Sequence, residues 1–186
     1  MKFPKLYTER LQLDPIHDKD VKEIFSIFSD PDVIAHYDIE KFHEVSEAAN
    51  LINYFKSQVE SGNGIRWAIR SKGKARLLGT CGFNSWNQYD HSAIIGYDLA
   101  KKHWGQGFAA EAVTAIINHI YSKDFRYFIN RIEASILTTN TPSIALCEKL
   151  GFHFEGVLRE KAYFGAKFHD MSLYSLLKKD WFERNA

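Results

Sequence analysis

Three apolar runs near the middle of the chain, at Ile65 to Arg70, Leu77 to Phe83 and Ala93 to Leu99, constrain the fold most. Each run has the length of a strand, and short polar turns join one run to the next. Such a succession indicates three strands of an antiparallel meander and therefore predicts a sheet in this part of the chain.

Apolar residues at helical spacing flank these strands. Val21, Ile24, Phe25 and Phe28 recur at i, i+3, i+4 and i+7, as on the buried face of a helix. The spacing predicts four helices: one opened by Asp18 and stopped at Ser29 to Asp32, one from Ser46 to Gly62, one from about Phe108 to Tyr121, and one with Thr141 as N-cap and Pro142 in its first turn, ended by Gly151.

Four further strands complete the pattern, at Thr8 to Leu13, Arg131 to Leu137, near Phe154 to Arg159, and near Phe168 to Leu177, with Gly165-Ala166-Lys167 as the turn between the last two. The order β-α-α-β-β-β-α-β-α-β-β predicts an α/β fold in which about four helices cover a mixed sheet of about seven strands. A length of 186 residues without a Pro/Gly/Ser-rich linker indicates one domain over residues 1–186.

Charge and cysteine content exclude several classes of protein. Lys plus Arg is 24 and Asp plus Glu is 23, so a net charge of +1 gives no reason to expect nucleic acid or an anionic membrane as partner. Cys81 and Cys147 fit free thiols in a reducing compartment. The chain shows neither a signal peptide nor a spanning apolar run, so we expect a cytoplasmic protein. Its eight histidines include no H-x-x-x-H, so we expect no metal site.

The segment Lys102-His103-Trp104-Gly105-Gln106-Gly107-Phe108-Ala109-Ala110-Glu111-Ala112 lies between a predicted strand and a predicted long helix. Two glycines two residues apart allow a tight turn, and the free amides of the following helical turn form a site for pyrophosphate. The segment lacks the pattern G-x-x-x-x-G-K-[ST] and the third glycine of G-x-G-x-x-G, which excludes two other phosphate loops. On this local pattern alone, a plain strand-to-helix turn is an equal alternative.

A second segment, Asn140-Thr141-Pro142-Ser143-Ile144-Ala145-Leu146-Cys147-Glu148-Lys149-Leu150-Gly151-Phe152, follows about 33 residues later. A capped amphipathic helix with a glycine stop explains Thr141, Pro142 and Gly151. It does not require Asn140, which is also a common loop residue.

Together the two segments resemble the GCN5-related N-acetyltransferases (GNAT), and among them the RimJ/RimL type that acetylates N-terminal alanine or serine of ribosomal proteins. Four further fragments fit this subgroup in order: Thr8-Glu9-Arg10-Leu11, Leu78-Gly79-Thr80-Cys81-Gly82-Phe83, Gly96-Tyr97-Asp98-Leu99 and Phe154-Glu155-Gly156-Val157. The resemblance covers nearly the whole chain and implies a GNAT fold with a mostly antiparallel, twisted sheet.

The resemblance also implies a site for acetyl-CoA. The family's [Q/R]-x-x-G-x-[G/A] loop matches at Gly105 and Gly107, with Lys102 in place of Gln or Arg, and backbone groups near Leu99 would pair with the pantetheine arm. A backbone amide of the same strand would stabilise the oxyanion of the tetrahedral intermediate. The residues that it assigns to the cofactor are Leu99, Ala100, Lys102, Gly105, Gln106, Gly107, Phe108, Ala109, Ala110, Asn140, Ser143 and Lys149.

The catalytic residues match the family less well. Many members have a tyrosine, the acid for the departing thiolate, where this chain has Cys147, so Ser143 is the first candidate for that acid and Cys147 the second. A strand glutamate of many members is Ile94 here. A terminal α-amine with a pKa near 8 is partly neutral at pH 7, so positioning alone could suffice, or Asp98, His91, Glu133 or His169 could act as a base.

The leading hypothesis is direct acetyl transfer from acetyl-CoA to a primary amine, with a protein or peptide N-terminus, ribosomal or other, as the favoured acceptor. A small amine such as a polyamine, an amino acid or an antibiotic is the alternative, and so is a degenerate acyl-CoA sensor without turnover. Trp86, Tyr89 and Tyr37 are candidates for the acceptor cleft, with ordinary packing as the safer expectation for any one of them. The aromatic content is also compatible with a homodimer.

Overall fold

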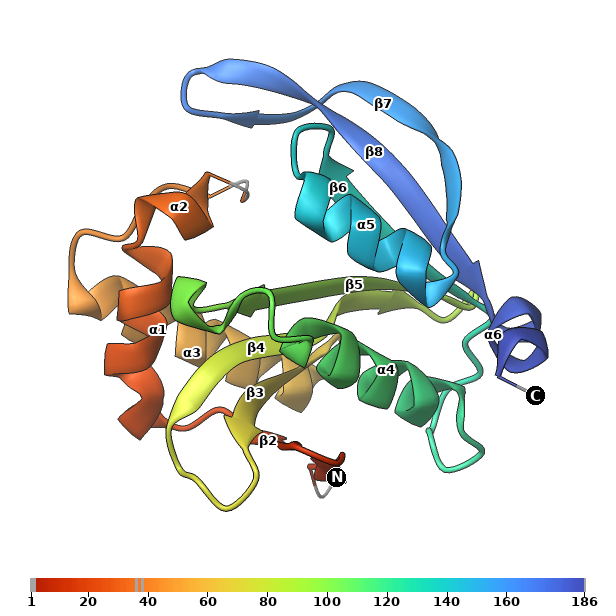
Figure 1. Cartoon of the computed structure of the whole chain (residues 1–186), viewed down its shortest axis with the longest axis horizontal. Helices are drawn as coiled ribbons and strands as arrows, with labels where there is room; N and C mark the ends of the chain where they lie inside the picture. Colours follow the sequence, from red (N-terminus) through yellow and green to blue (C-terminus); the bar gives the residue numbers. More distant parts are fainter. Residues whose placement is uncertain (1–2, 36, 38, 186) are drawn as a thin grey trace.

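The computed structural model describes residues 3–35, 37 and 39–185. In this part of the chain, eight strands form one open sheet in the order β1-β2-β3-β4-β5-β6-β8-β7 (Figure 1). Their bounds are Leu6–Tyr7 (β1), Leu11–Pro15 (β2), Ile65–Ser71 (β3), Leu77–Asn87 (β4), Ser92–Leu99 (β5), Arg131–Leu137 (β6), His153–Phe164 (β7) and Lys167–Leu177 (β8). Neighbouring strands are antiparallel except β5 and β6, which confirms the expected mixed, mostly antiparallel sheet.

The described residues form six helices: Val21–Phe28 (α1), Pro31–Ile34 (α2), Val45–Ser61 (α3), Phe108–Tyr121 (α4), Thr141–Leu150 (α5) and Lys178–Arg184 (α6). Four of them, α1, α3, α4 and α5, are the predicted helices. The expected totals of about seven strands and about four helices were too low, because β1, α2 and α6 are too short to show a period of their own.

Two predicted helix boundaries also change. The Ser-Asp-Pro-Asp cluster ends α1, but it also begins α2, because Asp30 accepts a hydrogen bond from the amide of Asp32 and Pro31 is the first helical residue. In α5 the N-cap is Asn140 and not Thr141, since the Asn140 side chain accepts from the amide of Ser143.

Alternation along the strands separates two apolar layers. Trp67 of β3 belongs to the cluster that contains α4 and α5, and its neighbour Ala68 belongs to the cluster that contains α1 and α3. Because successive strand residues point to opposite faces, α4 and α5 cover one face of the sheet and α1 and α3 cover the other.

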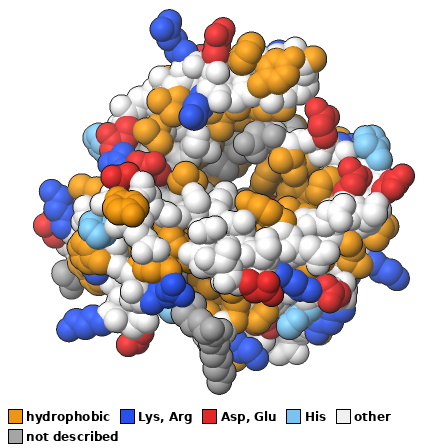
Figure 2. Space-filling view, turned by 180° about the vertical axis from the view of Figure 1, so that it is seen from behind, with side chains coloured by type: hydrophobic (Ala, Val, Ile, Leu, Met, Phe, Trp, Pro, Cys, Tyr) orange, Lys and Arg blue, Asp and Glu red, His pale blue; other side chains and the backbone are white. Residues whose placement is uncertain are grey.

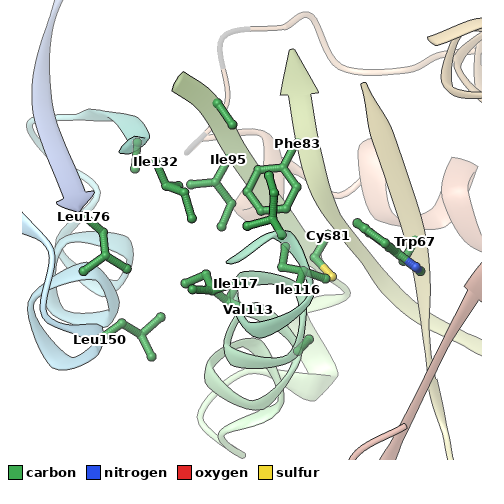
Figure 3. Close-up of a cluster of buried hydrophobic side chains, with 14 of the residues drawn as sticks. Trp67, Cys81, Phe83, Ile95, Val113, Ile116, Ile117, Ile132, Leu150 and Leu176 are labelled. Carbon is green, nitrogen blue, oxygen red and sulfur yellow. The ribbon is translucent and has the colours of Figure 1, made fainter. Parts of the chain in front are cut away.

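The larger core centres on α4. Ala112, Val113, Ile116, Ile117 and Ile120 are at most 2% exposed, and they meet side chains from the sheet, α5 and β8 (Figure 3). Burying a Val or Ile side chain stabilises a protein by about 1.5–3 kcal/mol. The core therefore holds α4 against the sheet and fixes the position from which its first turn begins.

The sheet opens between its two parallel strands. The paired residues of β5 and β6 run from Ser92 and Arg131 to Ile94 and Glu133, and no later pair joins them among the described residues. Beyond this point β6 continues with β8, and the long β7–β8 hairpin extends past the end of β6 (Figure 1). The divergence leaves the last residues of β5 facing a gap.

Candidate active site

A cleft with a volume of about 660 Å³ occupies the divergence of β5 and β6. The molecular surface is hollowed in this region, with apolar side chains around the hollow (Figure 2). The cleft reaches both faces of the sheet. On the α4–α5 face its walls are the glycine turn and the first turn of α5, and on the other face they include Val33, Tyr37, Arg66 and Asn84.

The two glycines form the turn that precedes α4. Gly105 has φ +71° and Gly107, the N-cap of α4, has φ +77°, a region that other residues adopt at a cost. Phe108, Ala109 and Ala110 follow and line the cleft. The first helical amides and the positive end of the helix dipole therefore face this end of the cleft, which suits an anion.

Arg10 braces this turn from the N-terminal end of the chain. Its Nη1 donates to the main-chain oxygen of Gln106 at 2.9 Å, and its guanidinium lies 4.7 Å from the centre of the Phe108 ring. The side chain of Gln106 in turn donates to the carbonyl of Lys102 at 2.9 Å. Sequence reasoning did not assign Arg10 to the site, although it stands in the Thr8-Glu9-Arg10-Leu11 fragment that carried part of the resemblance.

Glu111 connects the same fragment to the first turn of α4. Its carboxylate accepts from Thr8 Oγ1 at 2.5 Å and from the amide and Nε of Arg10 at 2.8 and 2.6 Å. Burial acts to raise the pKa of Glu111, but the hydrogen bonds from Thr8 and Arg10 outweigh it and lower that pKa below its usual value. The carboxylate is therefore ionised at neutral pH and holds the two segments together.

The open edge of β5 presents alternate backbone groups to the cleft. The carbonyl of Tyr97 accepts from the Tyr37 hydroxyl at 2.5 Å, and the carbonyl of Leu99 accepts from Trp104 Nε1 at 2.8 Å. The amide of Ala100 points the other way and donates to Leu78 in β4. Residues 97 and 99 therefore face the open edge, whereas the amide of Ala100 does not.

Helix α5 supplies the opposite wall. Asn140, Ser143 and Lys149 line the cleft. Cys147 is 3% exposed and is not among the lining residues, and burial raises the pKa of its thiol to about 12. The buried Asn140 side chain caps the helix at 3.2 Å from the Ser143 amide, which gives this asparagine a structural role in addition to the expected one.

A buried polar network forms the cleft wall on the α1–α3 face. Arg66 donates to Asp98 at 2.6 Å, to Thr80 at 2.8 Å and to Asn84 at 2.9 Å, and Asp98 also accepts from the amide and the hydroxyl of Thr80. Both charged side chains are at most 8% exposed. Because the Asp98 carboxylate already has three donors, the geometry favours a role in holding Arg66 over direct proton transfer.

Some of the other residues expected at the site line the cleft, and the rest lie outside it. Ile94 and Tyr37 line the cleft, whereas Ala100, Lys102 and Gln106 do not. His91, Glu133 and His169 lie outside the lining and contact Phe128, Arg131 and Phe164, respectively. Trp86 packs against Phe125 and Tyr127, and Tyr89 is 95% exposed.

His103 is a histidine of the cleft that the sequence analysis did not assign to the site. It lines the cleft, and its Nε2 is buried without a hydrogen-bond partner in the described part of the chain. Burial, together with the charges of Lys102 and Arg76, lowers its pKa, so the ring is neutral at pH 7. Across residues 3–35, 37 and 39–185 we find neither a group of His, Cys, Asp or Glu side chains that could hold a metal nor a helix able to cross a membrane.

A glycine turn at a helix N-terminus that opens into a cleft between diverging parallel strands is the arrangement that the resemblance to the GNAT acetyltransferases implied. The comparisons agree: the model of the acetyltransferase (GNAT) domain matches residues 10–153, and the chain therefore belongs to the GNAT acetyltransferase family. It is an acetyl-CoA-dependent N-acetyltransferase.

Relatives and solved structures extend this assignment over the length of the chain. N-acetyltransferase p20 of Bacillus licheniformis, whose function is uncharacterized, is 38% identical over 176 residues, which cover 95% of this chain and 97% of p20. The ribosomal protein uS5-alanine N-acetyltransferase of Escherichia coli is 23% identical over 95% of this chain and 92% of its own. The structure of RimL, a ribosomal L7/L12 α-N-protein acetyltransferase, in complex with coenzyme A has a TM-score of 0.83 at 18% identity, covers 94% of this chain and 98% of its own, and supports the fold.

Proposed function

We propose that this enzyme acetylates the N-terminal α-amine of a protein or peptide by direct attack on acetyl-CoA. The observation that carries the proposal is that one cleft passes through the sheet, from the glycine turn on one face to Arg66 and Tyr37 on the other. A donor and an acceptor can therefore enter from opposite faces and meet beside β5.

Acetyl-CoA would bind from the α4–α5 face. The amides of Phe108, Ala109 and Ala110 would hold the pyrophosphate, with Lys149 adding positive charge, and the pantetheine arm would pair with the open edge of β5 near Leu99. Asn140 and Ser143 line the wall that such an arm would face.

The charges that line the α1–α3 side of the cleft suit an amine with little positive charge. Asp98 is the one carboxylate among the described residues that line the cleft, and it is paired with Arg66. A polycation would meet no free negative charge there, whereas an α-amine with a pKa near 8 is partly neutral at pH 7. The relatives named for ribosomal-protein acetylation support the same class of acceptor.

In this mechanism the neutral amine attacks the thioester carbonyl, and a tetrahedral intermediate forms without a covalent bond to the enzyme. A backbone amide on the open edge of β5 would stabilise the oxyanion. The Ser143 hydroxyl, which lines the cleft, would hydrogen-bond the departing sulfur, whereas Cys147 is buried and does not line the cleft.

Two measurements on the purified chain test the proposal. Calorimetric titration with acetyl-CoA should show saturable micromolar binding at one site per chain. Thiol release should then be faster with peptides that begin with alanine or serine than with spermidine or free amino acids. Binding without thiol release from any amine would indicate a sensor instead, and absence of binding at millimolar acetyl-CoA would overturn the proposal.

A further inference from the structure

Tyr97 places a phenol in the cleft that no step described so far uses. It precedes Asp98 in β5, so the two side chains leave the sheet on opposite faces. Asp98 joins Arg66 on the α1–α3 face, whereas Tyr97 packs with the core on the face of α4 and α5. The Tyr97 ring therefore enters the cleft on the face where acetyl-CoA would bind.

The hydroxyl of Tyr97 is buried, and no described residue meets hydrogen-bond geometry with it, although the Ser143 hydroxyl lies near enough to act on it as a hydrogen-bonding neighbour. A buried donor without a partner destabilises the folded protein, so its retention requires a reason. Its polar neighbours are Ser143 and Cys147, which lie four residues apart on one face of α5. Burial is the largest influence on the Tyr97 pKa and raises it, the Ser143 hydroxyl lowers it, and the phenol stays protonated at neutral pH.

We propose that the Tyr97 hydroxyl is the proton donor to the departing CoA thiolate, with Ser143 holding the sulfur beside it. This inference rests on the function proposed above. It assigns the proton to a strand residue, and it explains why a donor without a partner is kept in the lining of the cleft.

In the proposed acetyl transfer, the amine nitrogen bonds to the thioester carbonyl carbon and then loses a proton to solvent water. When the tetrahedral intermediate collapses, the C–S bond breaks, and the sulfur takes the proton of the Tyr97 hydroxyl. The resulting phenolate regains a proton from solvent, so the products are an acetamide and CoA thiol.

Chemistry favours Tyr97 over its two neighbours as the source of the proton. A phenol is a much stronger acid than the aliphatic hydroxyl of Ser143. Cys147 is not among the residues that line the cleft. Tyr97 combines an acidic proton with a position in the lining.

Tyr97→Phe tests the inference, because it removes the hydroxyl and keeps the ring. Since that hydroxyl has no partner in the described structure, the variant should unfold at a Tm equal to or above that of the unsubstituted protein. Calorimetry should give an acetyl-CoA Kd within about twofold of the original, while kcat for an N-terminal alanine peptide falls about 100-fold, as for loss of a general acid.

Tyr121→Phe is the matched control. The Tyr121 hydroxyl is also buried, but it donates to Leu176 at 2.7 Å and lies outside the cleft lining, so this variant should lose Tm and keep kcat. The kcat of Tyr97→Phe with a selenoester of CoA distinguishes proton donation from a role of Tyr97 in packing. A selenolate is a weaker base and leaves without a proton, so the Tyr97→Phe defect should shrink to a few-fold with this donor.

The outcomes separate the two proposals. If Tyr97→Phe keeps its kcat within about threefold, or if its defect is the same with the selenoester, then Tyr97 is not the donor and the acetyltransferase proposal stands. If the unsubstituted chain binds no acetyl-CoA, both proposals fail together.

Discussion

The guanidinium of Arg10 donates a hydrogen bond to the main-chain carbonyl of Gln106, across 96 residues of sequence. Gln106 is the residue between the two glycines, so this contact ties the shape of the glycine turn to the segment before β2. The turn and the first amides of α4 are therefore supported from outside their own segment.

Arg10→Met should weaken acetyl-CoA binding. Methionine keeps apolar contact with Phe108 but removes the donors to Gln106 and Glu111, and the loss of about 1–1.5 kcal/mol corresponds to roughly tenfold in Kd. Calorimetric titration measures the change. Arg126→Met, at an exposed arginine stacked on Tyr127, is the control and should leave Kd unchanged. Equal affinities for all three proteins would show that the turn keeps its shape without Arg10.

The lowered pKa of Glu111 predicts an acid-dependent contribution to stability. A carboxylate with a folded-state pKa below its unfolded value stabilises the fold above the unfolded pKa, and the contribution is lost as pH falls through the folded pKa. The Tm difference between the unsubstituted protein and Glu111→Gln should thus be constant above about pH 6 and shrink between about pH 5 and 3. Thermal melts at each pH test this.

Glu60→Gln, at an exposed position near the end of α3, is the matched control for the loss of one carboxylate. Its Tm difference should be smaller than that of Glu111→Gln at neutral pH. A Glu111→Gln difference that grows on acidification would contradict the assignment of the Thr8 and Arg10 hydrogen bonds to the ionised form.

Gly107→Asp should abolish acetyl-CoA binding. A Cβ at Gly107 would lie 3.3 Å from Arg10 Nη2 and raise strain at φ +77°, and the carboxylate would repel the pyrophosphate. Gly73→Asp has a similar φ of +74° and open space around its Cβ, in a turn between β3 and β4. It should show the stability loss without the binding defect. If both variants bound acetyl-CoA equally well, the turn would not be the pyrophosphate site.

Local periodicity accounts for most of what the sequence predicted correctly. The stripe of α4 and the apolar runs of β3 and β5 are properties of consecutive residues, and they follow from the residues alone. The short elements β1, α2 and α6 were missed because two to seven residues do not establish a period. Asn140 was missed as a cap because Asn and Thr are both good N-cap residues and stand next to each other.

The glycine turn of the site could be predicted from the sequence. The parts of the site that depend on contacts between distant segments could not. Gly105 and Gly107 could be recognised because their backbone conformation excludes most other residues. The divergence of β5 from β6 leaves no mark in the sequence pattern, since both strands continue to carry apolar residues beyond Ile94 and Glu133. Tyr97 could be placed on a strand, but its proximity to Ser143 depends on how α5 packs.

Ser143 and Cys147 should separate in their effect on catalysis. Ser143→Ala should slow acetyl transfer more than it weakens acetyl-CoA binding, with kcat down about tenfold for a lost hydrogen bond to the sulfur. Cys147→Ala should keep kcat and lose Tm, because the thiol is buried and packed and its pKa of about 12 keeps it protonated. A kcat loss confined to Cys147→Ala would assign protonation of the departing CoA thiolate to the Cys147 thiol.

Asp98→Asn should lower the free energy of unfolding strongly and the rate of acetyl transfer only modestly. The substitution leaves Arg66 charged and buried with its main partner gone, and breaking a buried ion pair in this way costs about 3–5 kcal/mol. Urea unfolding at pH 7 measures the loss, and the double variant Arg66→Met/Asp98→Asn should recover part of it, because no unpaired charge remains. Transfer by Asp98→Asn, assayed in the cold where the variant is folded, should fall less than tenfold if Asp98 only positions Arg66. A loss of 100-fold or more in fully folded protein would instead make Asp98 the base that receives the proton of the amine.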